Sequence, residues 1–278
     1  MILPKALSGL ILVVVVLALA FAQSRGQSNM TDGFYNKPVE LKLERSIKKT
    51  FSSYLRQQAS DYYRPRPFDQ LSPESFYPIG WSRDGKFAYY LEPVDEVCGC
   101  YFAKLVILDL KTDKVLWSFD YNSEAIEEAK EEGKPYSLDT LWSANRQLFS
   151  DKLREHAIKP QTRFRLLSFP ANHKGELLTA TLRTKEKQEL TDEERLYGII
   201  GEATLQLNSS RRGKKTILDH SYGKSPPLHV GLLGYVKSPF EPRIAVVLMT
   251  VIRGWEGPPH TGDVQIVGAS LEDGFKRL

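Results

Sequence analysis

The stretch GWSRDGKFAYYL, from Gly80 to Leu91, decides the fold, together with LVILDLKTDKVLW from Leu105 to Trp117. In the first stretch, Asp84-Gly85 favours a tight turn, because glycine adopts a positive φ without steric cost. Apolar and aromatic runs follow that turn and flank the polar turn at Lys111–Lys114, and such runs are typical of β-strands. Strands joined in sequence by short connections predict an antiparallel meander.

A second copy of this pattern lies near the C-terminus, where GYVKSPFEPRIAVVL (Gly234–Leu248) precedes GDVQIVGASLEDG (Gly262–Gly274). Each copy gives an aromatic residue, a Ser-led turn, a strand, a long loop and a second apolar strand. The later copy departs at its turn, where Pro239 and Glu241-Pro242 replace Asp-Gly. The segment 201–218 resembles the outer strands of the same unit. We therefore expect a fold built of blade-like meanders.

The first copy resembles the repeat of TolB-like β-propellers, in which a Trp-Ser-x-Asp-Gly-Lys turn leads into a strand and an Asp-Leu strand end precedes a Thr-x-Lys turn. The matching residues are Trp81, Ser82, Asp84, Gly85, Lys86, Asp109, Leu110, Thr112 and Lys114. The resemblance implies a mainly β fold of antiparallel blades, and the residue pattern adds helical insertions to it. The blades either close as a propeller, which takes about four or more of them, or form an open sheet. By analogy, such repeats imply a binding scaffold more often than an enzyme.

The chain divides into three parts: a signal peptide over 1–22, an N-terminal helix with an aromatic, Pro-rich connector over 23–78, and a β-rich blade-like domain over 79–278. The helix is predicted over 39–57 from apolar residues spaced by four. A helical insertion is expected at about 123–156. The expected strands beyond it are 163–169, 176–183, 202–207, 214–218, 228–235, 244–252 and 264–270, with one short helix at 191–197.

The insertion is expected to hold two helices. The first is acidic and covers 123–132, where glutamates make a solvated face. The second begins at Ser137, a favourable helix cap, and continues to about His156 with apolar residues along one side.

The N-terminus has the pattern of a secretory signal. Lys5 precedes an uncharged apolar run, which ends in Ala20-Phe21-Ala22, a small-x-small cleavage site. Cleavage after Ala22 predicts a secreted or periplasmic protein. The alternative is an uncleaved membrane anchor, since the run is at the lower edge of what spans a bilayer. This segment is the one membrane contact that the sequence suggests.

Composition restricts the class of protein. Hydrophobic residues make up 41% of the chain and charged residues 26%, which is ordinary for a globular protein, and the formal net charge is only +4. Such a small positive excess, in an exported protein, argues against nucleic-acid binding. The partners that we expect are an envelope protein or a polysaccharide.

Cys98 and Cys100 are the only cysteines, and Gly99 separates them. In an oxidising compartment a local disulfide is the first interpretation, because Gly99 lets the chain bend and brings the two sulfurs closer. Free or intermolecular thiols, redox chemistry and metal binding are the alternatives. With no histidine nearby, two thiolates make a poor zinc site, and no metal site is predicted.

The loop from Trp255 to Asp263 combines an indole, two carboxylates and an imidazole between two expected strands. Loops held by a rigid sheet often carry binding function, so Trp255, Glu256, His260 and Asp263 are the candidate binding residues. The alternative is ordinary turn chemistry. Arg253–Gly257 also faintly resembles bacterial secreted proteins of unknown function, a likeness that implies no activity.

No catalytic signature or cofactor motif is found. Asp219-His220-Ser221 places three triad residue types side by side, but neighbours in sequence cannot point at one another as a triad requires. The leading hypothesis is therefore an exported, non-catalytic binding or interaction protein. The alternative is an envelope enzyme or thiol-redox protein that uses Cys98 and Cys100.

Overall fold

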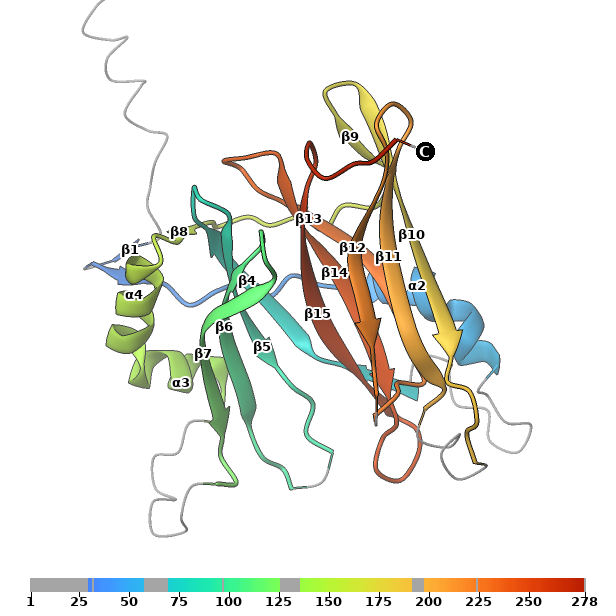
Figure 1. Ribbon diagram of the computed structural model, residues 1–278. Coiled ribbons are helices and arrows are strands. Elements are labelled where there is room, and N and C mark those ends of the chain that lie inside the picture. The colour runs from blue at the N-terminus through green and yellow to red at the C-terminus, as the bar shows by residue number, and fades with distance from the viewer. Residues whose placement is uncertain are drawn as a thin grey trace, which may run out of the picture.

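The computed structural model describes residues 30–31, 33–57, 70–96, 98–125, 136–191, 198–223 and 225–277. Within these ranges the chain forms three sheets of four or five strands, one two-stranded ribbon and three helices. Figure 1 shows the three large sheets beside one another, with the helices at their margins. The predicted class, mainly β with helical insertions, is confirmed.

The first sheet is the meander that the sequence predicts. Its strands are β4 (Ser75–Trp81), β5 (Lys86–Glu92), β6 (Phe102–Asp109) and β7 (Lys114–Asn122), and the short β8 (Lys159–Pro160) is added beside β4. Every pairing is antiparallel. The expected domain boundary at residue 79 falls inside β4.

The second sheet is also an antiparallel meander. It consists of β9 (Ala171–His173), β10 (Glu176–Glu186), β11 (Ile200–Ser209) and β12 (Gly213–Ser221), in the order β12-β11-β10-β9. A hairpin joins β11 to β12, which contain the strands expected over 202–207 and 214–218.

The third sheet contains β13 (His229–Lys237), β14 (Arg243–Ile252) and β15 (His260–Ser270), and the early strand β3 (Leu71–Pro73) joins it in parallel beside β15. The chain therefore crosses from the third sheet to the first between β3 and β4. This crossing brings the N-terminal part of the domain against its last strand.

The third sheet lies between the other two, because β14 is buried on both faces. Ala245, Val247 and Met249 pack in a cluster with residues of the first sheet. Alternate residues of the same strand, Val246 and Leu248, pack in a cluster with the second sheet. A strand covered on both faces requires a continuous apolar sequence, which β14 has.

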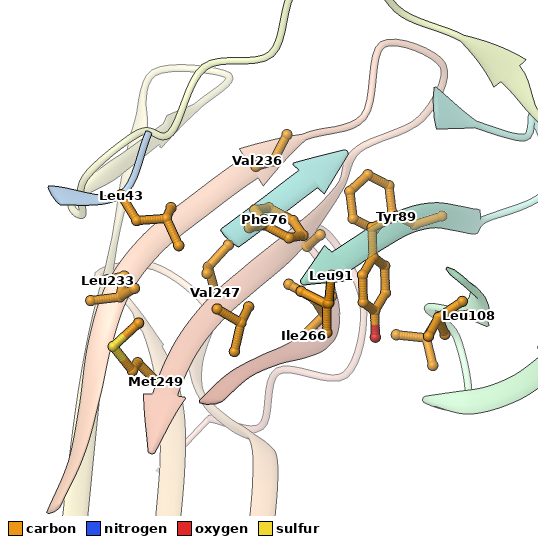
Figure 2. Close-up of a cluster of buried hydrophobic side chains, with 14 of the residues drawn as sticks. Leu43, Phe76, Tyr89, Leu91, Leu108, Leu233, Val236, Val247, Met249 and Ile266 are labelled. Carbon is orange, nitrogen blue, oxygen red and sulfur yellow. The ribbon is translucent and has the colours of Figure 1, made fainter. Parts of the chain in front are cut away.

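Figure 2 shows the core between the first and third sheets. Phe76 and Tyr89 of the first sheet face Val247 and Ile266 of the third. Phe76 is fully buried, and each buried large side chain contributes about 1.5–3 kcal/mol to folding. This core fixes the two sheets, and with them the loops at their ends.

Helix α2 (Glu44–Gln57) closes one edge of this core. Ile47 and Phe51, on its apolar side, are buried against β13, and the hydroxyl of Ser46 donates to the carbonyl of Leu233. The spacing by four predicts this face of the helix correctly, although the helix begins five residues later than expected.

Helices α3 (Leu138–Ala144) and α4 (Arg146–Glu155) cover the outer face of the first sheet, together with the ribbon of β1 (Met30–Thr31) and β2 (Phe34–Tyr35). Ser137 caps α3 as predicted, with Thr140 completing the reciprocal bonds. The sequence predicts one helix to His156, whereas the structure has two, with a break at Asn145, whose φ of −110° is not helical.

One predicted strand is not found as such, and three predicted segments lie mostly or wholly outside the described residues. The strand expected over 163–169 is reduced to a single bridge between Leu167 and Tyr235. The expected helix over 123–132 lies mostly outside the described residues, as does the one over 191–197, and the signal segment 1–22 lies wholly outside them. Among the residues that the structure describes, no helix is both long enough and apolar enough to cross a bilayer.

Gly80 and Gly234 are needed for close packing at two corresponding bulges, one in β4 and one in β13. A Cβ on Gly80 would lie 2.2 Å from the carbonyl oxygen of Lys159, and a Cβ on Gly234 would lie 2.4 Å from that of Leu167. In both places another segment pairs with the strand at the bulge, a later one at Gly80 and an earlier one at Gly234, so only glycine fits.

Candidate functional site

Two loops meet at the same end of the first and third sheets. The disulfide loop, residues 93–101, joins β5 to β6, and the tryptophan loop, residues 253–259, joins β14 to β15. A direct hydrogen bond links them: the Trp255 backbone N–H donates to Glu96 Oε2 at 2.9 Å. The two segments that the sequence singles out separately are thus neighbours in space.

The disulfide loop is ordered by its own polar contacts. Cys98 and Cys100 form a disulfide with their Cα atoms 5.1 Å apart, which confirms the first interpretation of this pair. The Asp95 carboxylate accepts the backbone N–H of Cys98 at 3.1 Å and that of Cys100 at 2.9 Å. These bonds fix the backbone of the neighbouring Glu96.

The tryptophan loop is folded tightly on itself. Gly257 N–H donates to the carbonyl of Gly254 at 3.1 Å, and Gly254 N–H donates to His260 Nδ1 at 3.3 Å. A Cβ on Gly254 would lie 2.3 Å from the carbonyl oxygen of Pro259, so a larger residue would open the loop. The loop therefore presents Trp255 from a fixed backbone.

A cavity of about 410 Å³ lies between these loops. It is lined by Ser72, Val94, Asp95, Glu96, Trp255, Glu256, Gly257, Pro258, Pro259 and Thr261. The Trp255 side chain is 79% exposed, the most exposed of the large hydrophobic residues that the structure describes. Indole and proline rings give the cavity apolar surface, and three carboxylates give it negative charge.

Two acidic residues near the cavity, Asp263 and Glu74, have raised pKa values. Partial desolvation raises the pKa of Asp263 above its ordinary value, and the negative charge of Glu96 raises it further. Burial likewise raises the pKa of Glu74 to about 7, against a hydrogen bond from Val264 N–H that favours the carboxylate, and Asp263 adds to the rise. The acidic side chains thus give the cavity a negative electrostatic potential, which nearby positive groups offset only in part.

The four candidate binding residues separate into two groups. Trp255 and Glu256 line the cavity and are exposed. His260 is 6% exposed and lies behind the loop, where its Nδ1 accepts the Gly254 N–H. Burial lowers the pKa of His260, assisted by the nearby charge of Arg253, so its imidazole is neutral at pH 7. Asp263 lies on β15 beside the cavity without lining it.

Glu96 lines the cavity but is not among the binding residues that the sequence predicts. Its acidity and its place beside the cysteines were visible, but its contact with Trp255 spans 159 residues and depends on how the sheets stack. Ser72 is a similar case, because only the parallel pairing of β3 with β15 brings it to the cavity.

The two cysteines of the disulfide loop and Glu124, which follows β7, form a group with the geometry of metal ligands. The sulfurs of Cys98 and Cys100 and a carboxylate oxygen of Glu124 lie within 4.8 Å of one another. The disulfide uses both sulfurs, so these atoms can hold a metal only after reduction. In addition, Cys98 Sγ is 3.5 Å from Asp95 Oδ1, and a carboxylate at this distance disfavours the thiolate form.

Comparison with known proteins gives no match: no family model, no curated protein and no solved structure corresponds to this chain. The site therefore has to be interpreted from its own geometry.

Proposed function

We propose that the protein is an exported binding protein that works without catalysis and holds its partner at the cavity between the disulfide loop and the tryptophan loop. The observation that carries this proposal is the exposure of Trp255 on a fixed backbone at a cavity mouth. Together with Pro258 and Pro259 the exposed indole forms a contiguous apolar surface at the cavity, and such a surface on a rigid loop is typical of a binding contact.

The construction of the site supports binding more than turnover. Its polar groups are carboxylates and two hydroxyls, and the neutral imidazole nearest to it is buried behind the loop. A general acid or base must reach the proton that it transfers, and His260 does not line the cavity.

The architecture also supports a scaffold with functional loops, as in TolB-like repeats. The Ser82 N–H donates to the carbonyl of Lys86 across one turn, and the Ser238 N–H donates to the carbonyl of Arg243 across the other. These turns follow the glycine bulges in β4 and β13. We propose that both meanders derive from one repeated unit, which leaves the inter-strand loops free to carry the binding site.

The partner that we expect is a macromolecule of the cell envelope, in keeping with the export signal in the sequence. The test is retention of envelope-extract components on the immobilised mature protein. Trp255→Ala should lower retention at least about fivefold while leaving the melting temperature within about 2 °C, because an exposed side chain adds little to stability.

The matched control for this test is Leu177→Ala, which removes another exposed apolar side chain, 54% exposed, from β10 in the second sheet. It should leave retention unchanged. Equal loss in both variants would indicate non-specific adsorption, and unchanged retention by Trp255→Ala would refute the proposed site.

A further inference from the structure

Trp255 presents its indole to solvent from a loop whose backbone is held by hydrogen bonds. Glu96 holds the backbone at Trp255, and Gly254 is fixed by Gly257 and His260 on either side. The ring is 79% exposed in this structure. Pro258 and Pro259 extend the apolar surface along the same cavity wall.

The charged side chains that line this cavity have one sign, although Arg253 lies close by in the tryptophan loop. All three ionisable side chains that line the cavity, Asp95, Glu96 and Glu256, are acidic, and no lysine or arginine is among its lining residues. Asp263 stands next to them, and its pKa is raised by burial first and then by the negative charge of Glu96. A ligand that enters here gains by bringing positive charge.

An aromatic face beside carboxylates is an arrangement that typically binds an organic cation. The ring quadrupole attracts a guanidinium or ammonium group, and carboxylates accept its N–H groups as charge-assisted hydrogen bonds. We infer that the cavity takes the basic side chain of a partner protein, with its methylene stem on Trp255 and the prolines and its charged head on the carboxylates. This inference rests on the proposed function.

Other occupants fit less well. An acidic polysaccharide would meet three carboxylates of its own sign. A divalent metal ion needs six or so oxygen ligands at about 2.0–2.6 Å, whereas both Asp95 oxygens already accept backbone N–H groups and the cavity of about 410 Å³ is far larger than one ion. A long, partly apolar cation uses the indole, the prolines and the carboxylates together.

The test is calorimetric titration of the full mature protein with a hexa-arginine peptide, with hexaglutamate, a glucosamine hexamer and calcium chloride as the other probes. Hexa-arginine should bind, hexaglutamate should not, and about 0.5 M salt should weaken binding because the carboxylates are partly exposed. Trp255→Ala should raise the Kd roughly tenfold and Glu256→Gln roughly threefold.

Glu186→Gln and Leu177→Ala are the controls, since each removes the same kind of group from an exposed position in the second sheet. If these controls weaken hexa-arginine binding as much as the cavity variants do, the peptide binds by net charge alone and the inference fails. Tighter binding of the glucosamine hexamer would indicate that the partner is an aminopolysaccharide and not a protein. Binding of calcium alone would indicate a metal site.

The experiment also separates this inference from the proposed function. If envelope retention depends on Trp255 while hexa-arginine does not bind, the cavity is a binding site for a different chemistry and only the inference is overturned. If neither retention nor peptide binding depends on Trp255, both are overturned.

Discussion

Trp255 and His260 lie five residues apart in one connection and have opposite roles. The indole is exposed at the cavity, whereas the imidazole is buried and accepts the Gly254 N–H. From the sequence alone the two look equally suited to binding, because polarity and aromaticity do not reveal which side of a folded loop a residue occupies.

His260→Ala should therefore unfold the loop, whereas Trp255→Ala should only remove a binding contact. Removing the imidazole leaves a buried N–H without its acceptor and a void behind the loop, which together cost about 2–3 kcal/mol. Chemical denaturation checks this value. His220→Ala, at an exposed position on β12, is the control and should change the free energy of unfolding by less than about 0.5 kcal/mol. A stable His260→Ala variant would contradict the conclusion that His260 supports the loop.

Glu74 should make the protein less stable as pH rises towards neutrality. Its pKa is about 7 in the folded protein against 4.5 in the unfolded chain, so folding holds a proton that unfolding releases. The free energy of unfolding should fall between about pH 4.5 and pH 7, by an amount on the order of 3 kcal/mol. Glu74→Gln should abolish this part of the fall.

The measurement is the free energy of unfolding of wild type and Glu74→Gln from pH 4 to pH 8.5. Wild type and variant should agree near pH 4, and the variant should be the more stable above pH 7. Glu186→Gln, at an exposed position, should follow the wild-type curve. Parallel curves for wild type and Glu74→Gln would show that folding does not raise the pKa of Glu74.

At the scale of the elements, sequence patterns are most informative where one face of an element is buried. The apolar residues of α2 at spacings of four and the cap at Ser137 are local features, and both are found as predicted. The segment 163–169 looks like a strand for the same local reasons, yet it contributes only the Leu167 bridge. The pairing of that segment depends on a distant strand, which local pattern does not encode.

The glycine bulge in β4 should be intolerant of any side chain. Gly80→Ala places a Cβ 2.2 Å from a backbone carbonyl oxygen of β8, which cannot move as a flexible side chain could. We expect a loss of about 3 kcal/mol. Gly175→Ala, where a Cβ would meet nothing within 4 Å, should cost only about 1 kcal/mol from its positive φ. Equal losses would mean that β8 yields to the added methyl group.

Removing the disulfide should affect binding more than stability. The bridge closes only two residues, so its loss costs about 1.5 kcal/mol or less. Replacing Cys98 and Cys100 by serine frees the loop that positions Glu96 against Trp255, and retention of envelope components should fall about threefold. Thermal melting and the retention assay measure the two effects.

The same double variant tests the thiol-redox alternative. Insulin-reduction activity of the wild type that disappears in the double serine variant, with retention unaffected, would favour a redox protein over a binding protein. The carboxylate 3.5 Å from Cys98 Sγ leads us to expect no such activity in either protein.

At the scale of the molecule, the sequence predicts the meanders but not their stacking. The apolar run of β14 is visible as a strand, whereas its position between two other sheets is clear only from the alternate residues that enter two different cores. Likewise, the parallel pairing of β3 with β15 joins segments almost two hundred residues apart. The candidate site depends on both features, so the sequence indicates its two loops separately and not as one cavity.

The most direct test of the central claim, that these two loops form one binding site, is site-specific photocrosslinking. Glu256 at the cavity and Glu186 on the second sheet are each replaced by p-benzoylphenylalanine, and both proteins are irradiated in envelope extract. We predict a discrete crosslinked species from position 256 and none from position 186, and Trp255→Ala should remove it. Equal crosslinking from both positions, or a species from position 186 alone, would contradict the account.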